Sequence, residues 1–128
     1  MKSKPTVLII EDDATTRKVL TGGLAMAGIP VHTASSAEEA SNVLAEKTID
    51  VIVTDLMMPR FNGVELIQAV REAPHTKHIP ILVFTSGGNL ELMEQAMQAG
   101  ANEIAQKHNT PPAKLVEKIL KLHETGGR

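Results

Sequence analysis

Several classes of protein are excluded by what this sequence of 128 residues lacks. It contains no cysteine, so it forms no disulfide and no thiolate metal or redox site. It has no tryptophan or tyrosine, and Phe61 and Phe84 are its two aromatic residues, which argues against a surface that stacks nucleic-acid bases. The longest apolar runs, such as residues 7–10 and 81–84, have four members, whereas a membrane-spanning helix needs about 20.

Net charge and composition exclude further classes of protein. The formal net charge is −2, which is too small and of the wrong sign for a broad nucleic-acid-binding field. Apolar residues make up 42% and charged residues 22% of the chain, as in ordinary globular proteins. No apolar segment near the start is long enough for a signal peptide. The sequence therefore predicts one cytoplasmic domain over residues 1–128, with its core over about 6–122, that contacts neither membrane nor nucleic acid.

The hydrophobic pattern predicts an α/β fold. Short β-branched runs are typical of buried parallel strands, and here they alternate with segments whose apolar residues recur at the helical period. Five repeats of strand and helix indicate a (βα)5 doubly wound, five-stranded parallel sheet. The predicted strands are residues 6–10, 31–34, 51–54, 81–85 and 103–106. The predicted helices are residues 14–27, 36 onward, 62–73, 89–100 and 110 onward.

Two of the helices carry local signals that the structure can test. Thr110, which precedes two prolines, is typical of the residue that caps a helix start. In the first helix, Gly22 and Gly23 each disfavour helix formation by roughly 1 kcal/mol relative to alanine. Either these glycines permit close packing against another element, or this helix is soft.

Polar residues gather where the predicted strands end. The acidic run Glu-Asp-Asp at residues 11–13 follows the first strand, and Asp55 follows the third. Thr85 ends the fourth strand, and Lys107 follows the fifth. Because ligands of open parallel sheets bind beyond the carboxyl ends of the strands, we expect these side chains to share one site.

The residue types at this edge suit phosphoryl transfer. Asp12, Asp13 and Asp55 would repel one another unless a cation intervened, and an all-oxygen set of ligands suits Mg²⁺. Lys107 adds a positive charge and Thr85 a hydroxyl, so Asp55 is placed to accept a phosphoryl group as an acyl phosphate. Each residue also has an ordinary interpretation: Asp13 as a helix cap, Lys107 as a surface charge, and Thr85 as a strand residue. Their joint placement at separate strand ends favours the site.

At these residues the sequence resembles the receiver domain of two-component response regulators, of the stand-alone chemotaxis-regulator type. The resemblance runs from Thr6 to about Leu122, and its most specific segment is Asp-x-x-Met-Pro-x-x-Asn-Gly over residues 55–63. It implies a flavodoxin-like sheet with strand order 2-1-3-4-5. It also implies a signalling switch rather than an enzyme, since a receiver catalyses only its own phosphorylation and dephosphorylation.

The resemblance assigns roles at the acidic edge. Asp55 is the expected phosphoacceptor, and its donor would be a phosphohistidine on a histidine kinase or phosphotransfer protein. Asp13 resembles the direct Mg²⁺ ligand, and Asp12 the ligand that acts largely through water. Asp55 and the backbone carbonyl of Met57 complete the expected metal site.

The resemblance also implies how the signal leaves the domain. Thr85 would move onto the phosphoryl oxygens, and Lys107 would pair with the phosphoryl group. The downstream protein is expected on the face made by the fourth helix, the fifth strand and the fifth helix, whereas Met93 and Met97 are expected in the core. The exposed candidates on that face are Ile104, Gln106, Glu91, Glu94, Gln95, Gln98, Lys114 and Lys118.

Two residues depart from the family pattern. Receivers usually carry an aromatic residue three positions before the lysine, and here that position is Ile104, which has no ring to couple to the switch. A proline usually follows the lysine, often after a cis bond, and here His108 follows. A non-proline cis bond costs roughly 2.5–4 kcal/mol, so this loop is either trans or strained.

Three kinds of function remain open. The chain is interpreted first as a monomeric single-domain response regulator with no effector domain. The alternative is a receiver-like protein-interaction module that is not phosphorylated. An enzyme or cofactor binder on the same fold is disfavoured, because a flavodoxin would need a phosphate-binding loop after the first strand and an aspartate phosphatase would place Asp-x-Asp there. Motility, a phosphorelay and enzyme regulation are equally open as outputs.

Overall fold

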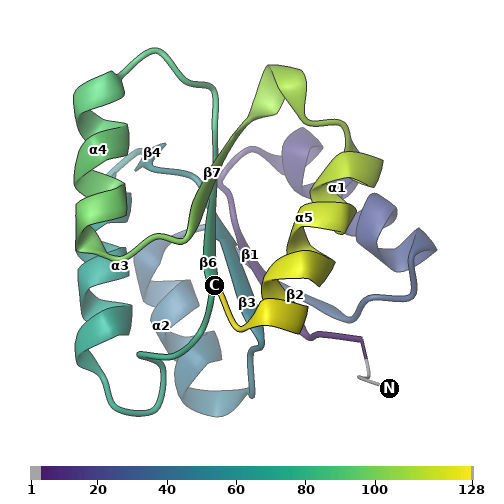
Figure 1. Ribbon diagram of the computed structural model, residues 1–128, viewed down its shortest axis with the longest axis horizontal. Coiled ribbons are helices and arrows are strands. Elements are labelled where there is room, and N and C mark those ends of the chain that lie inside the picture. Colours follow the sequence, from purple (N-terminus) through teal and green to yellow (C-terminus); the bar gives the residue numbers. More distant parts are fainter. Residues whose placement is uncertain (1–3, 128) are drawn as a thin grey trace.

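Five strands form one parallel sheet in the computed structural model, which describes residues 4–127 (Figure 1). They are β1 (Val7–Ile10), β2 (Val31–Ala34), β3 (Val51–Thr54), β6 (Ile81–Thr85) and β7 (Glu103–Gln106). Their order across the sheet is β2-β1-β3-β6-β7, and every neighbouring pair is parallel. The predicted order 2-1-3-4-5 and the flavodoxin-like fold are therefore confirmed.

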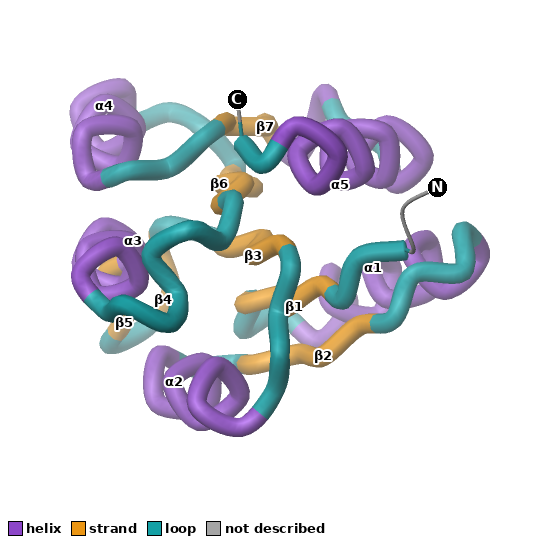
Figure 2. Tube along the Cα trace, turned by 60° about the horizontal axis from the view of Figure 1, so that its bottom comes forward, coloured by secondary structure: helices purple, strands orange, loops and turns teal. Residues whose placement is uncertain are grey.

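Helices cover both faces of this sheet. They are α1 (Ala14–Met26), α2 (Ala37–Glu46), α3 (Gly63–Glu72), α4 (Leu90–Ala99) and α5 (Pro112–Thr125). Figure 2 shows α1 and α5 on one side of the strands and α2, α3 and α4 on the other. Within residues 4–127, none of the helices has the length and apolar character needed to cross a membrane.

The alternation of side chains along the strands produces the two layers. In β1, Val7 and Ile9 belong to the core cluster under α1 and α5, whereas Leu8 and Ile10 belong to the cluster under α2, α3 and α4. All four side chains are at most 1% exposed. A parallel strand covered on both faces needs apolar residues at every position, which is why these strands are uninterrupted apolar runs.

Side-chain caps fix where three of the helices begin. Ser36, Asn62 and Asn89 each accept a hydrogen bond from a backbone amide in the first turn of α2, α3 and α4 respectively. Serine and asparagine are preferred at such positions because their oxygen satisfies an amide that has no partner within the helix. The predicted starts of these helices therefore agree with the structure to within a residue.

The structure contains short elements that the periodicity did not predict. Met57–Met58 (β4) and Phe61–Asn62 (β5) pair as a small antiparallel hairpin, and Lys107–Asn109 forms a 3-10 turn, η1. The turn carries the chain further before α5 begins, so Pro111, and not Thr110 as predicted, is the N-cap of α5. Two-residue strands and a single turn are too short for a hydrophobic period to show.

One of the paired glycines of α1, Gly23, permits close packing, whereas a Cβ at Gly22 would meet no atom of another element within 4 Å among residues 4–127. A Cβ at Gly23 would lie 2.8 Å from the Cβ of Pro112 in α5, which is closer than side-chain carbons approach. Glycine at this position lets α1 and α5 meet on the same face of the sheet. The structure therefore selects close packing over a soft helix at Gly23.

Helix α4 is less buried than its sequence predicts. Ala96 is its only fully buried residue, and Leu90 and Met97 are 76% and 45% exposed. Met93 packs partly against the core, as expected, but the expectation that Met97 lies in the core is wrong. Helical spacing predicts which residues share a face, but it does not show whether a neighbouring element covers that face.

An arginine ties together the edge of the molecule opposite the acidic residues. Arg71, in the last turn of α3, donates hydrogen bonds to the carbonyls of Lys77, Ile79 and Gly100, at 3.0, 2.7 and 3.0 Å. It also donates to Oδ1 of Asn102 at 2.9 Å. Since all four acceptors are uncharged oxygens, Arg71 links α3 to the end of α4 and the start of β7 through hydrogen bonds alone.

We expect Arg71→Ala to lower the free energy of unfolding by about 2–3 kcal/mol, because hydrogen bonds from a charged donor to partly buried carbonyls are lost. The measurement is urea denaturation followed by circular dichroism, since the chain has no tryptophan for fluorescence. Lys121→Ala, which removes the same charge from an exposed position of α5, is the control and should change the free energy by at most ~0.5 kcal/mol. Equal losses in both variants would contradict the role of Arg71.

Candidate functional site

The carboxyl ends of the central strands bring the predicted site residues together. Glu11 follows β1, Asp55 follows β3, Thr85 ends β6 and Lys107 follows β7. Because β1, β3, β6 and β7 are consecutive and parallel in the sheet, these strand ends lie at one edge. Asp55 and Lys107, which are 52 positions apart in the sequence, are in direct contact there.

A single ammonium group lies between two carboxylates at the centre of the site. Lys107 Nζ is 2.7 Å from Oε1 of Glu11 and 2.9 Å from Oδ2 of Asp55. The two acidic residues are buried, at 3% and 8% exposure, whereas the Lys107 side chain is 22% exposed. Buried carboxylates need a charged partner to remain ionised, and Lys107 supplies that charge to both.

Asp55 is held by its own backbone as well as by Lys107. Its Oδ1 accepts hydrogen bonds from the amides of Leu56 at 2.7 Å and Met57 at 3.4 Å. Gly63, at the start of α3, supports this turn: a Cβ there would lie 2.7 Å from Cα of Leu56 and 2.9 Å from the carbonyl oxygen of Asp55. The conformation around Asp55 therefore depends on the absence of a side chain at position 63.

The structure places the acidic run differently from the prediction. Asp13 is exposed, and its Oδ2 accepts hydrogen bonds from the amide and the hydroxyl of Thr16, at 2.8 and 2.7 Å, as the N-cap of α1. Glu11, which the sequence analysis left without a role, points to Lys107 and accepts a hydrogen bond from the amide of Asp13 at 3.2 Å. The sequence signal that was available is the spacing of Asp13 and Thr16 at the start of the helical period.

Arg17 fixes the segment that carries these acids. One of its nitrogens, Nη1, donates to the carbonyl oxygens of Glu11 and Asp12, each at 2.9 Å. These carbonyls lie just beyond β1, where the sheet no longer supplies a partner. Arg17 thereby orients the backbone from which the side chains of Glu11 and Asp12 project.

The predicted switch residues lie close to this centre. Thr85 is buried, and its Oγ1 lies 3.5 Å from the amide of Gly87, which donates to it. Ile104 packs against the core cluster under α2, α3 and α4. Every peptide bond among residues 4–127 is trans, so the bond that precedes His108 is trans rather than strained.

Burial and pairing shift the titration of Glu11 and Lys107. Removal from water raises the pKa of Glu11, and the hydrogen bond from Lys107 opposes this without cancelling it. Burial alone would lower the pKa of Lys107, but hydrogen bonds to Glu11 and Asp55 outweigh burial, so the pKa of Lys107 is raised. The contribution of Lys107 to stability is thus fully present below the ordinary lysine pKa and is lost as the pH rises through the raised value.

The donor atoms at this edge are of the kind that Mg²⁺ prefers. The carboxylates of Glu11, Asp12 and Asp55 supply hard oxygen ligands, and Asp12 is exposed with no partner for its side chain in the described chain. No three His, Cys, Asp or Glu side chains within residues 4–127 converge closely enough to hold a metal ion, and Lys107 lies between two of the acids. The residues fit a magnesium ion by their chemistry.

The predicted partner surface divides into a groove and its surroundings. Figure 1 shows β7 between α4 and α5, and a groove of about 640 Å³ lies between α4 and β7. Outside the groove, Glu91, Gln95 and Lys114 are exposed, and Lys118 pairs with Glu103 at 2.5 Å. The residues that line the groove are Leu90, Met93, Glu94, Met97, Gln98, Ile104 and Gln106.

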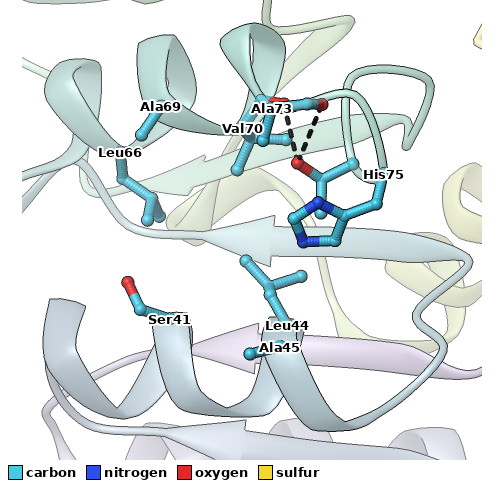
Figure 3. Close-up of a pocket in the computed structure, with 9 residues that line it drawn as sticks. Ser41, Leu44, Ala45, Leu66, Ala69, Val70, Ala73 and His75 are labelled. Atoms are coloured by element: carbon cyan, nitrogen blue, oxygen red, sulfur yellow. Dashed lines mark hydrogen bonds between the residues drawn. The ribbon is translucent and has the colours of Figure 1, made fainter.

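Another hollow, of about 210 Å³, lies between α2 and α3 (Figure 3). In Figure 3, Ser41 and Leu44 of α2 face Leu66 and Ala69 of α3, and the ring of His75 lies at one end. Among residues 4–127, no carboxylate or amine lines it. It therefore lacks the charged groups that make the carboxyl edge of the sheet suited to phosphoryl chemistry.

Comparison with known proteins finds one family over most of the chain. The sequence pattern of the response regulator receiver domain matches residues 7–120. The chain is 33% identical over 119 residues to the chemotaxis protein CheY of Pseudomonas aeruginosa, covering 92% of this chain and 95% of that protein. The match to the phosphate regulon regulator PhoB of the same organism, at 29% identity, covers 94% of this chain but 53% of the relative. The chain thus spans only about half the length of some curated relatives.

Solved structures show the same fold. The crystal structure of FixJ-N has a TM-score of 0.84 at 32% identity, with 97% of this chain and 96% of that chain covered. The chemotaxis response regulator CheY4 of Vibrio cholerae has a TM-score of 0.85 at 28% identity, with 94% and 99% covered.

Because Asp13 caps α1, we expect substitutions at Asp13 and at Asp12 to affect thermal stability and Mg²⁺ affinity separately. Asp13→Ala should lower the melting temperature, because the cap of α1 is lost, and should leave the affinity for Mg²⁺ nearly unchanged. Asp12→Asn should weaken Mg²⁺ binding by roughly tenfold or more with little change in melting temperature. Isothermal titration calorimetry and thermal denaturation measure the two effects, and weaker Mg²⁺ binding in the Asp13 variant would restore Asp13 as a ligand.

The cap of α1 by Asp13 also predicts that the thermal stability of the protein depends on pH. The hydrogen bonds from the Thr16 hydroxyl and amide lower the pKa of Asp13, so its carboxylate stabilises the fold above the ordinary pKa of an aspartate and loses that effect as the pH falls through the lowered value. The melting temperature of the wild type should therefore exceed that of Asp13→Asn at neutral pH by a margin that shrinks in acid. A margin that stays constant from neutral pH to about pH 2 would contradict this assignment.

Proposed function

Because the chain belongs to the response regulator receiver domain family, we propose that it is a signalling switch phosphorylated on Asp55. The observation that carries this proposal is the position of Lys107, whose ammonium contacts both Asp55 and Glu11 at the edge of the sheet. A phosphoryl group on Asp55 would bring further negative charge to this place. Because the Lys107 ammonium is already held against the Asp55 carboxylate, it is in place to offset the charge of a phosphoryl group on Asp55.

The reaction needs few protein groups. A carboxylate oxygen of Asp55 attacks the phosphorus of a phosphohistidine, the phosphorus–nitrogen bond breaks, and its electron pair returns to the imidazole of the donor. The product is an acyl phosphate on Asp55. Lys107 offsets the charge of the transferred group, and the amides of Leu56 and Met57 hold the acceptor in place.

The metal would be held beside Asp55. Receiver domains of this family generally bind Mg²⁺ at the acidic pocket, and Asp12, Asp55 and the backbone carbonyl of Met57 are the ligands proposed here. Glu11 joins these proposed ligands in the place that the sequence analysis gave to Asp13, because the side chain of Asp13 caps α1. Bound Mg²⁺ would neutralise charge on the phosphoryl oxygens.

The switch would act through Thr85. Its hydroxyl accepts a hydrogen bond from Gly87 in the loop that leads to α4. If the hydroxyl moves to a phosphoryl oxygen, this contact is lost and the loop is released. Ile104 and Gln106 line the groove beside α4, so a change in the loop would reach the surface proposed to bind the downstream protein.

The proposed partners are proteins. A histidine kinase or phosphotransfer protein would supply the phosphoryl group in the cytoplasm, and a downstream protein would bind the monomer in the groove between α4 and β7. The relative in Pseudomonas aeruginosa that this chain covers almost completely is a chemotaxis protein, which favours motility among the outputs. A receiver-like module without phosphorylation is the competing function.

Intact mass measured after incubation with acetyl phosphate tests the proposal. The wild type should gain one phosphoryl group in the presence of Mg²⁺ and none in its absence, and hydroxylamine should remove it, as expected for an acyl phosphate. Asp55→Asn should gain none, because an amide oxygen is a poor nucleophile.

Asp13→Asn is the matched control, since it removes a charge from the same edge but keeps a side chain that can cap α1. It should be phosphorylated like the wild type. If the folded wild type gained no phosphoryl group, the unphosphorylated interaction module would replace the proposed function.

A further inference from the structure

The ammonium of Lys107 has a neighbour that the proposed reaction does not use. Besides its two carboxylate partners, Lys107 Nζ lies over the ring of Phe84, 5.9 Å from the ring centroid. Phe84 is a residue of β6, is 5% exposed, and immediately precedes Thr85. We propose that Phe84 is a positioning residue, whose ring holds the Lys107 ammonium against Asp55 and Glu11. This inference rests on the proposed function, in which Lys107 acts on the phosphoryl group.

The ring can do this because it is itself fixed. Phe84 belongs to the core cluster under α1 and α5, together with Leu20, Ala105 and Leu115. Its neighbour Val83 belongs to the cluster on the other face, so the strand alternation directs the Phe84 ring toward α1 and α5. A cation near the face of an aromatic ring is attracted by its quadrupole, and more strongly where water is partly excluded.

Lysine needs such a restraint more than arginine would. Its ammonium is a point charge on a flexible four-carbon stem, and the two carboxylates fix only the far end. Beside that stem is a cavity of about 260 Å³, whose lining includes Phe84, Lys107, Leu20, Val19 and Thr110. Without the ring this cavity would grow, and the side chain of Lys107 would gain conformations directed away from Asp55.

The ring of Phe84 is also distinct from the aromatic residue that this chain lacks. Ile104 occupies the position where receivers usually carry an aromatic residue, and it packs with the cluster under α2, α3 and α4. Phe84 lies on the opposite face of the sheet. The aromatic contact near Asp55 is therefore the one between Phe84 and Lys107, on the face of the sheet opposite Ile104.

The test compares Phe84→Leu, which removes the ring, with Phe84→Tyr, which keeps it. We expect Phe84→Leu to lower the initial rate of phosphorylation by acetyl phosphate roughly 3- to 10-fold at saturating Mg²⁺, and Phe84→Tyr to stay within about twofold of the wild type. Phe61→Leu, which changes the other aromatic residue, is the control. In a Lys107→Ala background Phe84→Leu should have no further effect, because the group that it positions is absent.

Nuclear magnetic resonance gives a reading that does not depend on phosphorylation. With lysine labelled at Cε, the Lys107 signal, assigned with Lys107→Arg, should be shifted upfield by the ring in the wild type and in Phe84→Tyr. The shift should vanish in Phe84→Leu, or in Phe84→Met if the leucine variant does not fold.

The two readings keep the two proposals apart. If the wild type is not phosphorylated, the proposed function fails and the signal of Lys107 alone decides whether Phe84 positions it. An unshifted signal in the wild type would overturn the inference. Equal rates for Phe84→Leu and Phe61→Leu in a phosphorylated protein would also overturn it.

Discussion

One ammonium group, that of Lys107, pairs with two buried carboxylates at the edge of the sheet, and the arrangement around it depends on this shared pairing. Glu11 and Asp55 directly follow the neighbouring strands β1 and β3, and without Lys107 their charges would oppose each other in a place that water barely reaches. The lysine comes from the far edge of the sheet, beyond β6. The ion pairs of Lys107 with Glu11 and Asp55 therefore form only when β1, β3 and β7 are assembled in the observed order. The charge state of the site is thus linked to the complete fold.

The start of α1 decides which acids reach this site. A helix that begins at Ala14 needs an acceptor at position 13 for its free amides, and the side chain of Asp13 provides it. That leaves Glu11, the last residue before the chain turns, to face the interior. The assignment of the acidic run is thus set by a local hydrogen-bonding requirement and not by the distance of each acid from Asp55 along the sequence.

The elements that could be predicted are those in which local pattern and tertiary packing agree. Buried strands such as β1 and β3 are uninterrupted apolar runs, so their existence and the doubly wound fold follow from the sequence. The placement of Asp55 and Lys107 at one edge of the sheet could be predicted because each directly follows a predicted parallel strand. The orientation of Glu11 and the exposure of Met97 were not predicted. The first follows from the hydrogen bonds by which Asp13 caps α1, and the second depends on which neighbour covers a helix face.

The two faces of the sheet carry different parts of the proposed switch. In the proposed function, Thr85, Gly87 and Ile104 connect the phosphoryl site to α4 and the groove beside β7. Ala96 is the one buried residue of α4. Phe84 and Lys107 lie against the layer of α1 and α5, which is packed closely through Gly23 and Pro112. A rigid layer suits groups that must hold an acceptor in place, and a loosely packed helix suits a surface that changes. The division of the core into two layers thereby separates the residues of the proposed phosphoryl chemistry from the surface proposed for its output.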